Sequence, residues 1–457
     1  MISLSAEAAP TSAHSQLSVA CSDADFSVKE ETKLHFVRNE DQKRVSEKQP
    51  VFALRYKQSK NTTFSKLKSR LSVSAVRNLG RKLETDNSCS RRAAIVFVGK
   101  MQLLAWFGLV LLCVLQSTGA CPSICKCSKK SNPEKSEVNC HKRGLRSLPS
   151  DLPTDVWILK LGENGITDLK ANLLRSVPTI ESLILEKNTI KSVHPKTFSG
   201  AKHLTLLNLL GNQITKLPPK VFKDLLNLRF LMLGQNEIGL IKAEMFVGMR
   251  NLSELDLPHN ALTVVPSNAF KPLIALKVLD LSLNRIQRLS PKAFTGLTQL
   301  LFLNLDNNSL KTIPAGVFRP LQSLEMLVLD NNLLSSLSQS ALDGLSSLQE
   351  LYLRNNELEL LPNDVFSNLP KLSELGLSGN HLKTVDGNTF SLVPELKKLH
   401  LHDNAWQCDC NIASLVKWME QTNTTLSPRD ALKCSSPPNL RNKNLIGLQT
   451  ETLTCNK

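Results

Sequence analysis

Aromatic residues are scarce in this 457-residue chain, where they make up 5% of the sequence and include only two Tyr and four Trp. Leucine dominates the apolar residues instead. A globular enzyme usually spreads its core over Val, Ile, Phe and Tyr as well as Leu. A core built from one residue type therefore indicates one structural unit that is used repeatedly.

Catalytic motifs are also missing, because the sequence has no G-x-S-x-G, H-E-x-x-H or phosphate-loop segment. Asp256 and Asp280 could act as an acid–base pair, but we expect both on an open sheet without a water-excluding pocket, where their pKa values need not shift. His400, His402 and Asp403 are too few to be interpreted as a zinc site, so we treat them as solvated strand residues. We predict that the protein is not an enzyme and uses no cofactor or metal.

Cysteine is absent from the middle of the chain and clustered on both sides of it. The two clusters are Cys121, Cys125, Cys127 and Cys140, and Cys408, Cys410, Cys434 and Cys455. Two even clusters around a cysteine-free middle indicate ends stapled by disulfides, although spacing alone does not choose the pairing. Disulfides of this kind need an oxidising compartment.

The net charge of +16 gives no sign of a nucleic-acid partner. It is divided equally between residues 1–100, with 18 Lys+Arg against 10 Asp+Glu, and residues 101–457, with 38 against 30. The second part is therefore only mildly basic for its length. It has no basic helix and no aromatic residues interleaved with Lys and Arg, so we expect no nucleic-acid binding.

Residues 101–120 have the three parts of a signal peptide: upstream basic residues, an apolar run over 103–115 and small residues before Ala120. The run is ~13 residues long, short for a membrane span of ~20. Residues 1–100 show no apolar period, and we interpret them as a disordered upstream extension or an artefact of the chosen start. A signal anchor over residues 93–115 is the alternative. No second apolar run follows, so we expect a mature chain that is secreted without a membrane anchor.

The middle of the chain is a repeat of 24 residues. Its marker is an asparagine, at Asn164, Asn188, Asn212, Asn236, Asn260, Asn284, Asn308, Asn332, Asn356, Asn380 and Asn404, within the frame L-x-x-L-x-L-x-x-N-x-L. The L-x-L segment predicts a short strand with leucines inward and x residues outward. Parallel pairing of these strands beside a bulkier opposite side predicts a curved α/β solenoid, a horseshoe with a concave sheet. A phenylalanine ten residues after most of the asparagines predicts a second inner column.

The outward strand positions form the candidate binding face. Large apolar residues are expected to face solvent there, with acidic residues beside them, as in a protein-binding site. The predicted ligand-binding residues are Leu206, Phe230, Met232, Glu254, Asp256, Asp280, Phe302, Met326, Val328 and Tyr352. The acidic side chains favour a basic protein partner. The simpler alternative is that scattered exposed apolar residues are common on protein surfaces.

The segments C-P-S-I-C-K-C at 121–127 and W-Q-C-D-C at 406–410, the latter before an expected helix around Trp418, resemble the caps of extracellular leucine-rich-repeat proteins. The resemblance covers residues 121–457, and within the typical class it is greatest to leucine-rich alpha-2-glycoprotein and the carboxypeptidase N large subunit. It implies the disulfides Cys121–Cys127, Cys125–Cys140, Cys408–Cys434 and Cys410–Cys455. Asn442 stands where such caps often carry Gly. The resemblance implies fold and location firmly and the partner only weakly.

These observations predict five parts: an extension (1–100), a signal peptide (101–120), an N-terminal cap (121–155), the repeats (156–403) and a C-terminal cap (404–457). We expect a secreted protein that binds a protein ligand on its concave face and modulates a signalling, plasma or matrix pathway. The alternatives are a non-catalytic stabilising subunit of a plasma peptidase and an innate receptor for microbial surfaces.

Two further surface features accompany this prediction. Asn251, Asn307 and Asn423 each begin N-x-[ST], so glycosylation is expected there, and a glycan at Asn307 would narrow the concave face. A basic N-terminal cap is a candidate contact for glycosaminoglycan, and its residues are Lys126, Lys129, Lys130, Lys142, Arg143 and Arg146.

Overall fold

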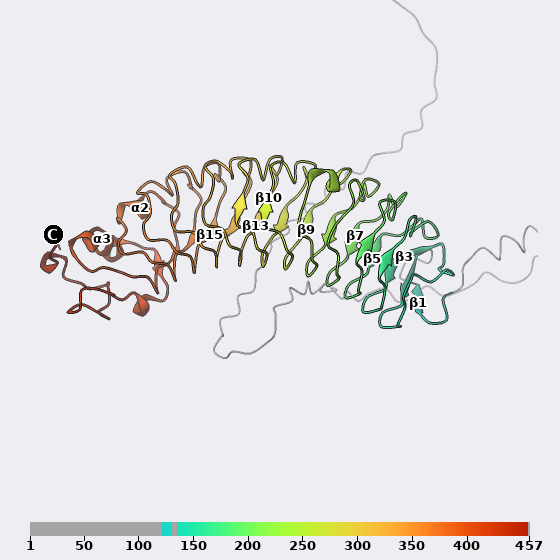
Figure 1. Ribbon diagram of the computed structural model, residues 1–457. Coiled ribbons are helices and arrows are strands. Elements are labelled where there is room, and N and C mark those ends of the chain that lie inside the picture. The colour runs from blue at the N-terminus through green and yellow to red at the C-terminus, as the bar shows by residue number, and fades with distance from the viewer. Residues whose placement is uncertain (1–120, 130–134, 456–457) are drawn as a thin grey trace, which may run out of the picture. The chain divides into compact units, whose positions relative to one another are not determined.

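The computed structural model describes residues 121–129 and 135–455. The predicted extension (1–100), the predicted signal peptide (101–120) and Lys130 lie outside the described residues. Figure 1 shows the described repeats as coils stacked side by side in an arc, with one long sheet along the inner side of the arc. The predicted leucine-rich-repeat horseshoe is confirmed.

In the described part of the chain, one sheet of 14 strands runs from cap to cap. The strands, in the order in which they pair, are β1 (Lys126–Lys129), β2 (Ser136–Asn139), β3 (Val156–Lys160), β5 (Ser182–Ile184), β7 (Leu206–Asn208), β8 (Phe230–Met232), β9 (Glu254–Asp256), β11 (Val278–Asp280), β13 (Phe302–Asn304), β14 (Met326–Val328), β15 (Glu350–Tyr352), β16 (Glu374–Gly376), β17 (Lys398–His400) and β18 (Thr425–Leu426). β1 and β2 pair antiparallel, and the later strands pair in parallel.

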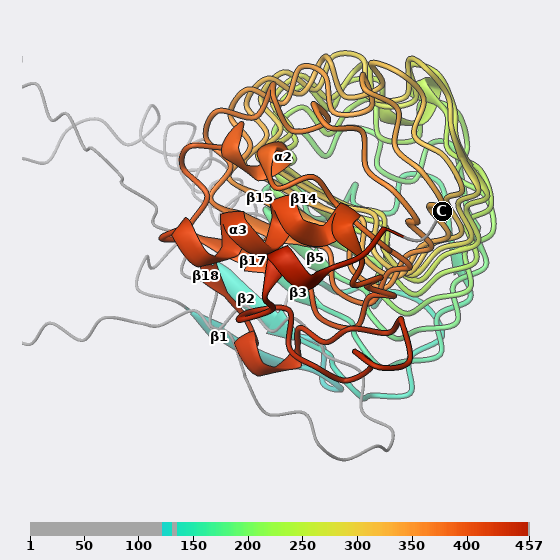
Figure 2. The same ribbon diagram turned by 90° about the vertical axis from the view of Figure 1, so that its left-hand side faces the viewer.

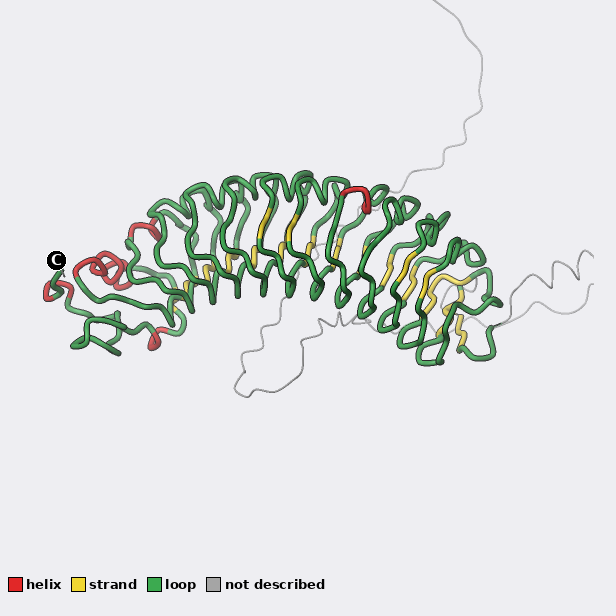
Figure 3. Tube along the Cα trace, viewed as in Figure 1, coloured by secondary structure: helices red, strands yellow, loops and turns green. Residues whose placement is uncertain are grey.

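The register of the sheet follows directly from the 24-residue period. Leu279 pairs with Leu255 on one side and Leu303 on the other, and all three are fully buried. Equivalent residues therefore form rows across the sheet, with leucines inside and the alternate positions outside. In the described part of the chain, the strands on the opposite side are the two-residue strands β4 (Asp168–Leu169), β6 (Ser192–Val193), β10 (Val264–Val265) and β12 (Arg288–Leu289). Figure 3 shows that loops fill most of this outer side, which is bulkier than the sheet and so bends the stack.

The repeated asparagines tie each coil to the one before it. The Nδ2 of Asn308 donates to the carbonyl oxygen of Leu281, one strand earlier, and to that of Leu305 in its own strand, at 3.0 and 3.1 Å. Its Oδ1 accepts from the backbone N–H of Ile286 at 2.9 Å. Its Nδ2 also donates to the carbonyl oxygen of Asp306 at 3.2 Å, so the buried amide bonds to four backbone groups from two repeats.

The phenylalanines form the predicted second column. Phe294 stacks on Phe318 with ring centroids 5.8 Å apart, and Phe270 lies 6.5 Å away on the other side. All of these rings are fully buried. At the C-terminal end the column is closed by Trp418, whose ring lies 5.1 Å from Phe390.

The C-terminal cap covers the open end of the stack (Figure 2). Its main helix is α3 (Ala413–Gln421), which carries Trp418 and matches the helix expected from the sequence. The shorter helices are η1 (Ala243–Phe246), α2 (Asn388–Ser391), η2 (Cys410–Ile412), η3 (Arg429–Ala431) and η4 (Thr450–Thr452). Asn442 has a φ of 66°, in the left-handed region that Asn tolerates better than most residues, which accounts for the departure from Gly.

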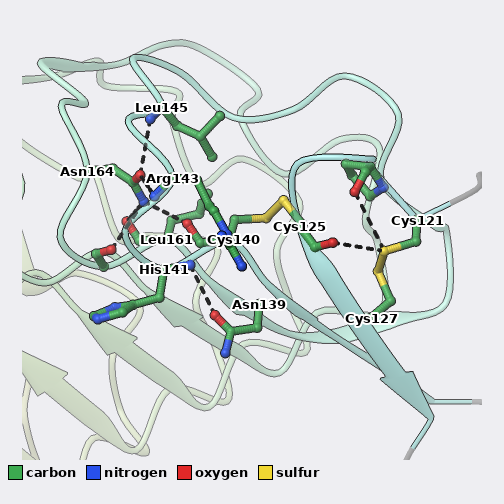
Figure 4. Close-up of a disulfide and its surroundings, with 12 residues drawn as sticks. Cys121, Cys125, Cys127, Asn139, Cys140, His141, Arg143, Leu145, Leu161 and Asn164 are labelled. Carbon is green, nitrogen blue, oxygen red and sulfur yellow. Dashed lines mark hydrogen bonds between the residues drawn. A yellow bond between two sulfur atoms is a disulfide. The ribbon is translucent and has the colours of Figure 1, made fainter.

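The disulfides join Cys121 to Cys127, Cys125 to Cys140, Cys408 to Cys434 and Cys410 to Cys455, the pairing implied by the resemblance. At the N-terminal cap, Asn164 of the first repeat donates to the Cys140 carbonyl and accepts from the backbone of Arg143 and Leu145 (Figure 4). The asparagine ladder therefore continues into the disulfide-bonded cap. No helix in residues 121–129 and 135–455 is long and apolar enough to cross a bilayer.

Candidate functional site

The ten predicted binding residues all lie on outward positions of neighbouring strands of the long sheet. Phe230 pairs with Leu206 and Glu254, and Met232 pairs with Asn208 and Asp256. Nine of the ten are partly exposed, so the face offers both apolar and acidic groups to solvent. Their placement on one face follows from the two-residue alternation of a strand.

Tyr352 is the exception, and the expectation that it faces solvent is wrong. Its exposed fraction is 8%, because the Arg354 guanidinium lies over its ring at 4.4 Å. Gly376 makes room for this arrangement, since a Cβ there would lie 2.9 Å from Arg354 Nε and 3.1 Å from the Tyr352 ring. The Tyr352 hydroxyl donates to Glu350 at 2.5 Å, and burial, followed by the Glu350 carboxylate, raises the pKa of Tyr352.

The N-terminal half of the concave face carries a continuous apolar strip. Its members are Leu206, Leu210, Phe230, Met232 and Pro258, all partly exposed. Leu210 and Pro258 approach each other across Gly234, where a Cβ would lie 3.1 Å from both side chains. Leu210 and Pro258 were not predicted from the sequence, because they follow the strand and lie at the turn beside it.

Leu283 borders the same region and was also missed. It is 48% exposed and has a φ of 53°, a conformation that a leucine adopts only at some energetic cost. The equivalent residues of the next three repeats are Asn307, Asn331 and Asn355, which suit the left-handed region. An exposed apolar residue held in an unfavourable conformation is a candidate for a functional contact.

Most acidic side chains on this face already have a partner within the chain. The pairs are Glu137 with Lys160, Glu181 with Lys135, Glu186 with Asn208, Asp306 with Asn331, Asp330 with Arg354, Glu350 with Tyr352 and Glu374 with Lys398. Asp280 accepts from the backbone N–H of Ser282 at 2.8 Å. Among the described residues, the side-chain carboxylates of Glu254 and Asp256 in β9 have neither a hydrogen bond nor an ion pair, although both residues make backbone hydrogen bonds.

Burial disfavours the negatively charged form of the acidic side chains of β9 and β11. Burial, together with the nearby carboxylates of Asp280 and Glu254, raises the pKa of Asp256 to about 7. Burial also raises the pKa of Glu254 and of Asp280. The expectation of unshifted pKa values for Asp256 and Asp280 is therefore wrong: the side chains of adjacent strands remove water even though the sheet is open on one side.

The C-terminal half of the face is instead occupied by its own contacts. Arg354 contacts Asp330 at 3.3 Å, and burial raises the pKa of Asp330 to about 6 against the opposing effect of Arg354. His400 lies 3.4 Å from Glu374, and its Nδ1 is 3.0 Å from the carbonyl oxygen of Ser427 in the C-terminal cap. Within the part of the chain that the structure describes, no three His, Cys, Asp or Glu side chains come together as a metal site.

The remaining predicted surface residues lie away from the strip. Asn251, Asn307 and Asn423 are exposed, and Asn307 Nδ2 donates to Asp306 at 2.8 Å at the margin of the concave face. In the N-terminal cap the exposed basic residues are Lys126, Lys129, Lys142, Arg143 and Arg146. Lys142 is paired with Glu163 at 2.8 Å.

Comparison with known families agrees with this architecture. The leucine rich repeat family matches residues 156–214, 202–262, 250–310, 303–358 and 346–405, and the leucine rich repeat N-terminal domain matches residues 120–153. Because the repeat matches together span more than half of the 457 residues, the chain belongs to the leucine-rich-repeat family. Proteins of this family typically bind other proteins and are not catalytic.

Individual relatives are similar over shorter segments. Leucine-rich repeat-containing protein 3 of Danio rerio is 33% identical over 92 residues, 20% of this chain and 34% of the relative. Leucine-rich repeat-containing protein 3B of Homo sapiens is 32% identical over 108 residues, 23% of this chain and 40% of the relative. The chain therefore spans only about a third to two fifths of the length of these relatives.

A solved structure is similar over a larger part of the chain. It is a chain in the octameric complex of Latrophilin 3 (Lec, Olf), Unc5D (Ig, Ig2, TSP1) and FLRT2 (LRR), with a TM-score of 0.53 and 26% identity. The similarity covers 71% of this chain and 97% of that one.

Proposed function

We propose that the protein is a secreted, non-catalytic binding protein whose concave face holds a protein ligand over strands β7–β11. The observation that carries this proposal is the contrast between the two halves of the face. In the C-terminal half most charged side chains are paired within the chain, whereas β9 combines two carboxylates that have no partner among the described residues with the adjacent apolar strip.

The chemistry of β7–β11 favours a basic protein partner. The strip offers apolar anchors of the kind that dominate protein interfaces, and Glu254 and Asp256 beside it are desolvated without a cation. An arginine or lysine of the ligand would supply that cation. The resulting ion pair would attract the ligand and fix its orientation in the complex. The similarity to a chain of a multi-protein complex supports protein binding as the general activity.

An extracellular location is part of the proposal. Four disulfides need an oxidising environment, which supports it, as does the signal peptide expected at residues 101–120. The cap residues resemble those of leucine-rich alpha-2-glycoprotein and the carboxypeptidase N large subunit, which favours a plasma or matrix setting. The relatives reported above are other leucine-rich-repeat proteins, so this finer likeness remains a proposal.

The test is a binding screen of purified extracellular protein domains against the secreted chain and matched variants. Phe230→Ala with Met232→Ala removes two anchors, and Asp256→Arg reverses the charge at position 256. Leu240→Ala is the control, because Leu240 is 45% exposed and lies at the outer-side position that Val264 of β10 fills in the next repeat. We expect the screen to find a ligand whose affinity is at least tenfold lower for both concave-face variants than for the wild type. The control should bind this ligand with unchanged affinity. Ligands that bind all the variants equally would place the site elsewhere.

A further inference from the structure

Leu226 is an apolar side chain that the fold leaves uncovered on a surface away from the concave face. Its exposed fraction is 47%, although its neighbours in sequence Leu225 and Leu228 are fully buried. Ile274 occupies the same position two repeats later and is 50% exposed. A covering group at either place would have to come from outside the packed core.

Asn251 lies close to Leu226 and is an attachment point for a group that covers it. Its side chain is exposed and reaches back to the preceding repeat, where Nδ2 donates to the carbonyl oxygen of Leu226 at 2.9 Å. Asn227 makes the same contact one repeat earlier, to the Lys202 carbonyl at 2.9 Å, so the direction of the side chain is set by the repeat geometry. Asn251 differs from Asn227 because Leu252 and Ser253 complete a glycosylation sequence after it.

We infer that Asn251 carries an N-linked glycan whose first sugar lies over Leu226 and shields it from solvent. The inference depends on the secreted location in the proposed function. In the transfer, Nδ2 forms a bond to the anomeric carbon of a lipid-diphosphate-linked oligosaccharide. The carbon–oxygen bond to the diphosphate breaks with its electron pair, and Nδ2 loses one proton to a base.

The linkage is compatible with the observed contact. An asparagine amide has two N–H groups, and glycosylation consumes one of them, so the other remains available to the Leu226 carbonyl. The sugar is then attached to an atom that lies against the Leu226 backbone. Ile274 has no equivalent cover, since the residue 25 positions after it is Gln299, which does not begin a glycosylation sequence. The two exposed side chains are therefore a matched pair, one shielded and one open.

Ser253 allows the glycan to be removed without touching Asn251. The Ser253 hydroxyl has no hydrogen-bond partner within the described residues, so Ser253→Ala abolishes the sequence with little other change. Ser253→Thr keeps the sequence, and Thr205 already occupies the same position two repeats earlier. Glycopeptide mass spectrometry of the secreted protein should find a glycan on Asn251 in the wild type and in Ser253→Thr, and none in Ser253→Ala.

Shielding is measured separately, as retention on a hydrophobic-interaction column. We expect Leu226→Ser to shorten retention in the Ser253→Ala background and to leave it nearly unchanged in the glycosylated protein. Ile274→Ser should shorten retention by a similar amount in both backgrounds. An equal effect of Leu226→Ser with and without the glycan overturns the shielding.

The mass spectra also separate this inference from the proposed function. Glycans on Asn307 or Asn423 with none on Asn251 would overturn the inference and leave the secreted location intact. A chain that carries no glycan at any of the three sequences would count against both.

Discussion

Asp256 and Asp280 occupy the same register position on the paired strands β9 and β11, yet only Asp280 accepts a hydrogen bond from within the described chain. Asp256 lies between Asp280 and the apolar Met232, so it loses water on both sides without gaining a donor. Such a carboxylate destabilises the folded chain at neutral pH. Its presence is understandable if a ligand completes its environment, because binding sites are often less stable than the rest of the fold.

The first prediction concerns the effect of Asp256 on stability. Its pKa of about 7 lies above its ordinary value of 3.8, so between these pH values the folded chain holds a proton that the unfolded chain has released. The stability contributed by this group is therefore greatest at low pH and falls as the pH rises through 7. We expect Asp256→Asn to raise the free energy of unfolding by about 1–3 kcal/mol at pH 8 and to have almost no effect near pH 4.

Urea unfolding of the wild type and Asp256→Asn at both pH values measures this difference. Asp430→Asn is the control, since Asp430 is exposed in the C-terminal cap and its replacement should matter little at either pH. A constant difference between wild type and Asp256→Asn across the pH range would show that the carboxyl group is ordinary.

The second prediction separates stability from binding at Leu283. Asparagine adopts the left-handed conformation more readily than leucine, and Leu283 is 48% exposed, so little buried surface is lost. Leu283→Asn should raise the free energy of unfolding by about 1 kcal/mol and weaken ligand binding several-fold. Lys220→Asn, at an exposed residue with a φ of 56° outside the concave sheet, should stabilise without changing affinity. Unchanged binding by Leu283→Asn would remove Leu283 from the site.

The repeated part of the fold was predictable because its information is local and periodic. The spacing of Leu, Asn and Phe sets which residues face inward, and the structure repeats that pattern from Leu159 to Leu401. The outward positions of the strands followed from the same alternation. The disulfide pairing did not follow from spacing and came from the resemblance of the caps.

The properties of the face were less predictable because they depend on neighbours 24 residues apart. Tyr352 is buried because Arg354 folds over it and Gly376 leaves space, and no rule of alternation contains that information. The raised pKa of Asp256 likewise arises from side chains on adjacent strands. The left-handed position before each ladder asparagine could have been suspected from Asn307, Asn331 and Asn355, which would have marked Leu283 as unusual.

The third prediction tests the asparagine ladder. Asn284 Nδ2 donates to the carbonyl groups of Leu257 and Leu281 at 2.9 and 3.0 Å, and its Oδ1 accepts from the Leu262 N–H at 3.1 Å. Asn284→Ala leaves these buried backbone groups unpaired and should lower the free energy of unfolding by about 1–3 kcal/mol. Asn368→Ala, at an exposed amide whose Nδ2 bonds to Asp343, should change it by less than ~0.5 kcal/mol. Equal effects of the two variants in urea unfolding would refute a structural role specific to the ladder.

The fourth prediction asks whether Tyr352 supports the fold rather than the ligand. Tyr352→Phe keeps the ring beneath Arg354 and removes only the hydroxyl that donates to Glu350. Because the lost bond is to a charged group, the free energy of unfolding should fall by about 1–2 kcal/mol, measured by urea unfolding. Ligand affinity should stay within twofold of the wild type, since the ring is almost fully buried and lies in the C-terminal half of the face.

Phe230→Ala should show the opposite pattern, with a large loss of affinity and a smaller loss of stability, because its side chain is partly exposed. A loss of affinity in Tyr352→Phe as large as that in Phe230→Ala would extend the binding site to β15.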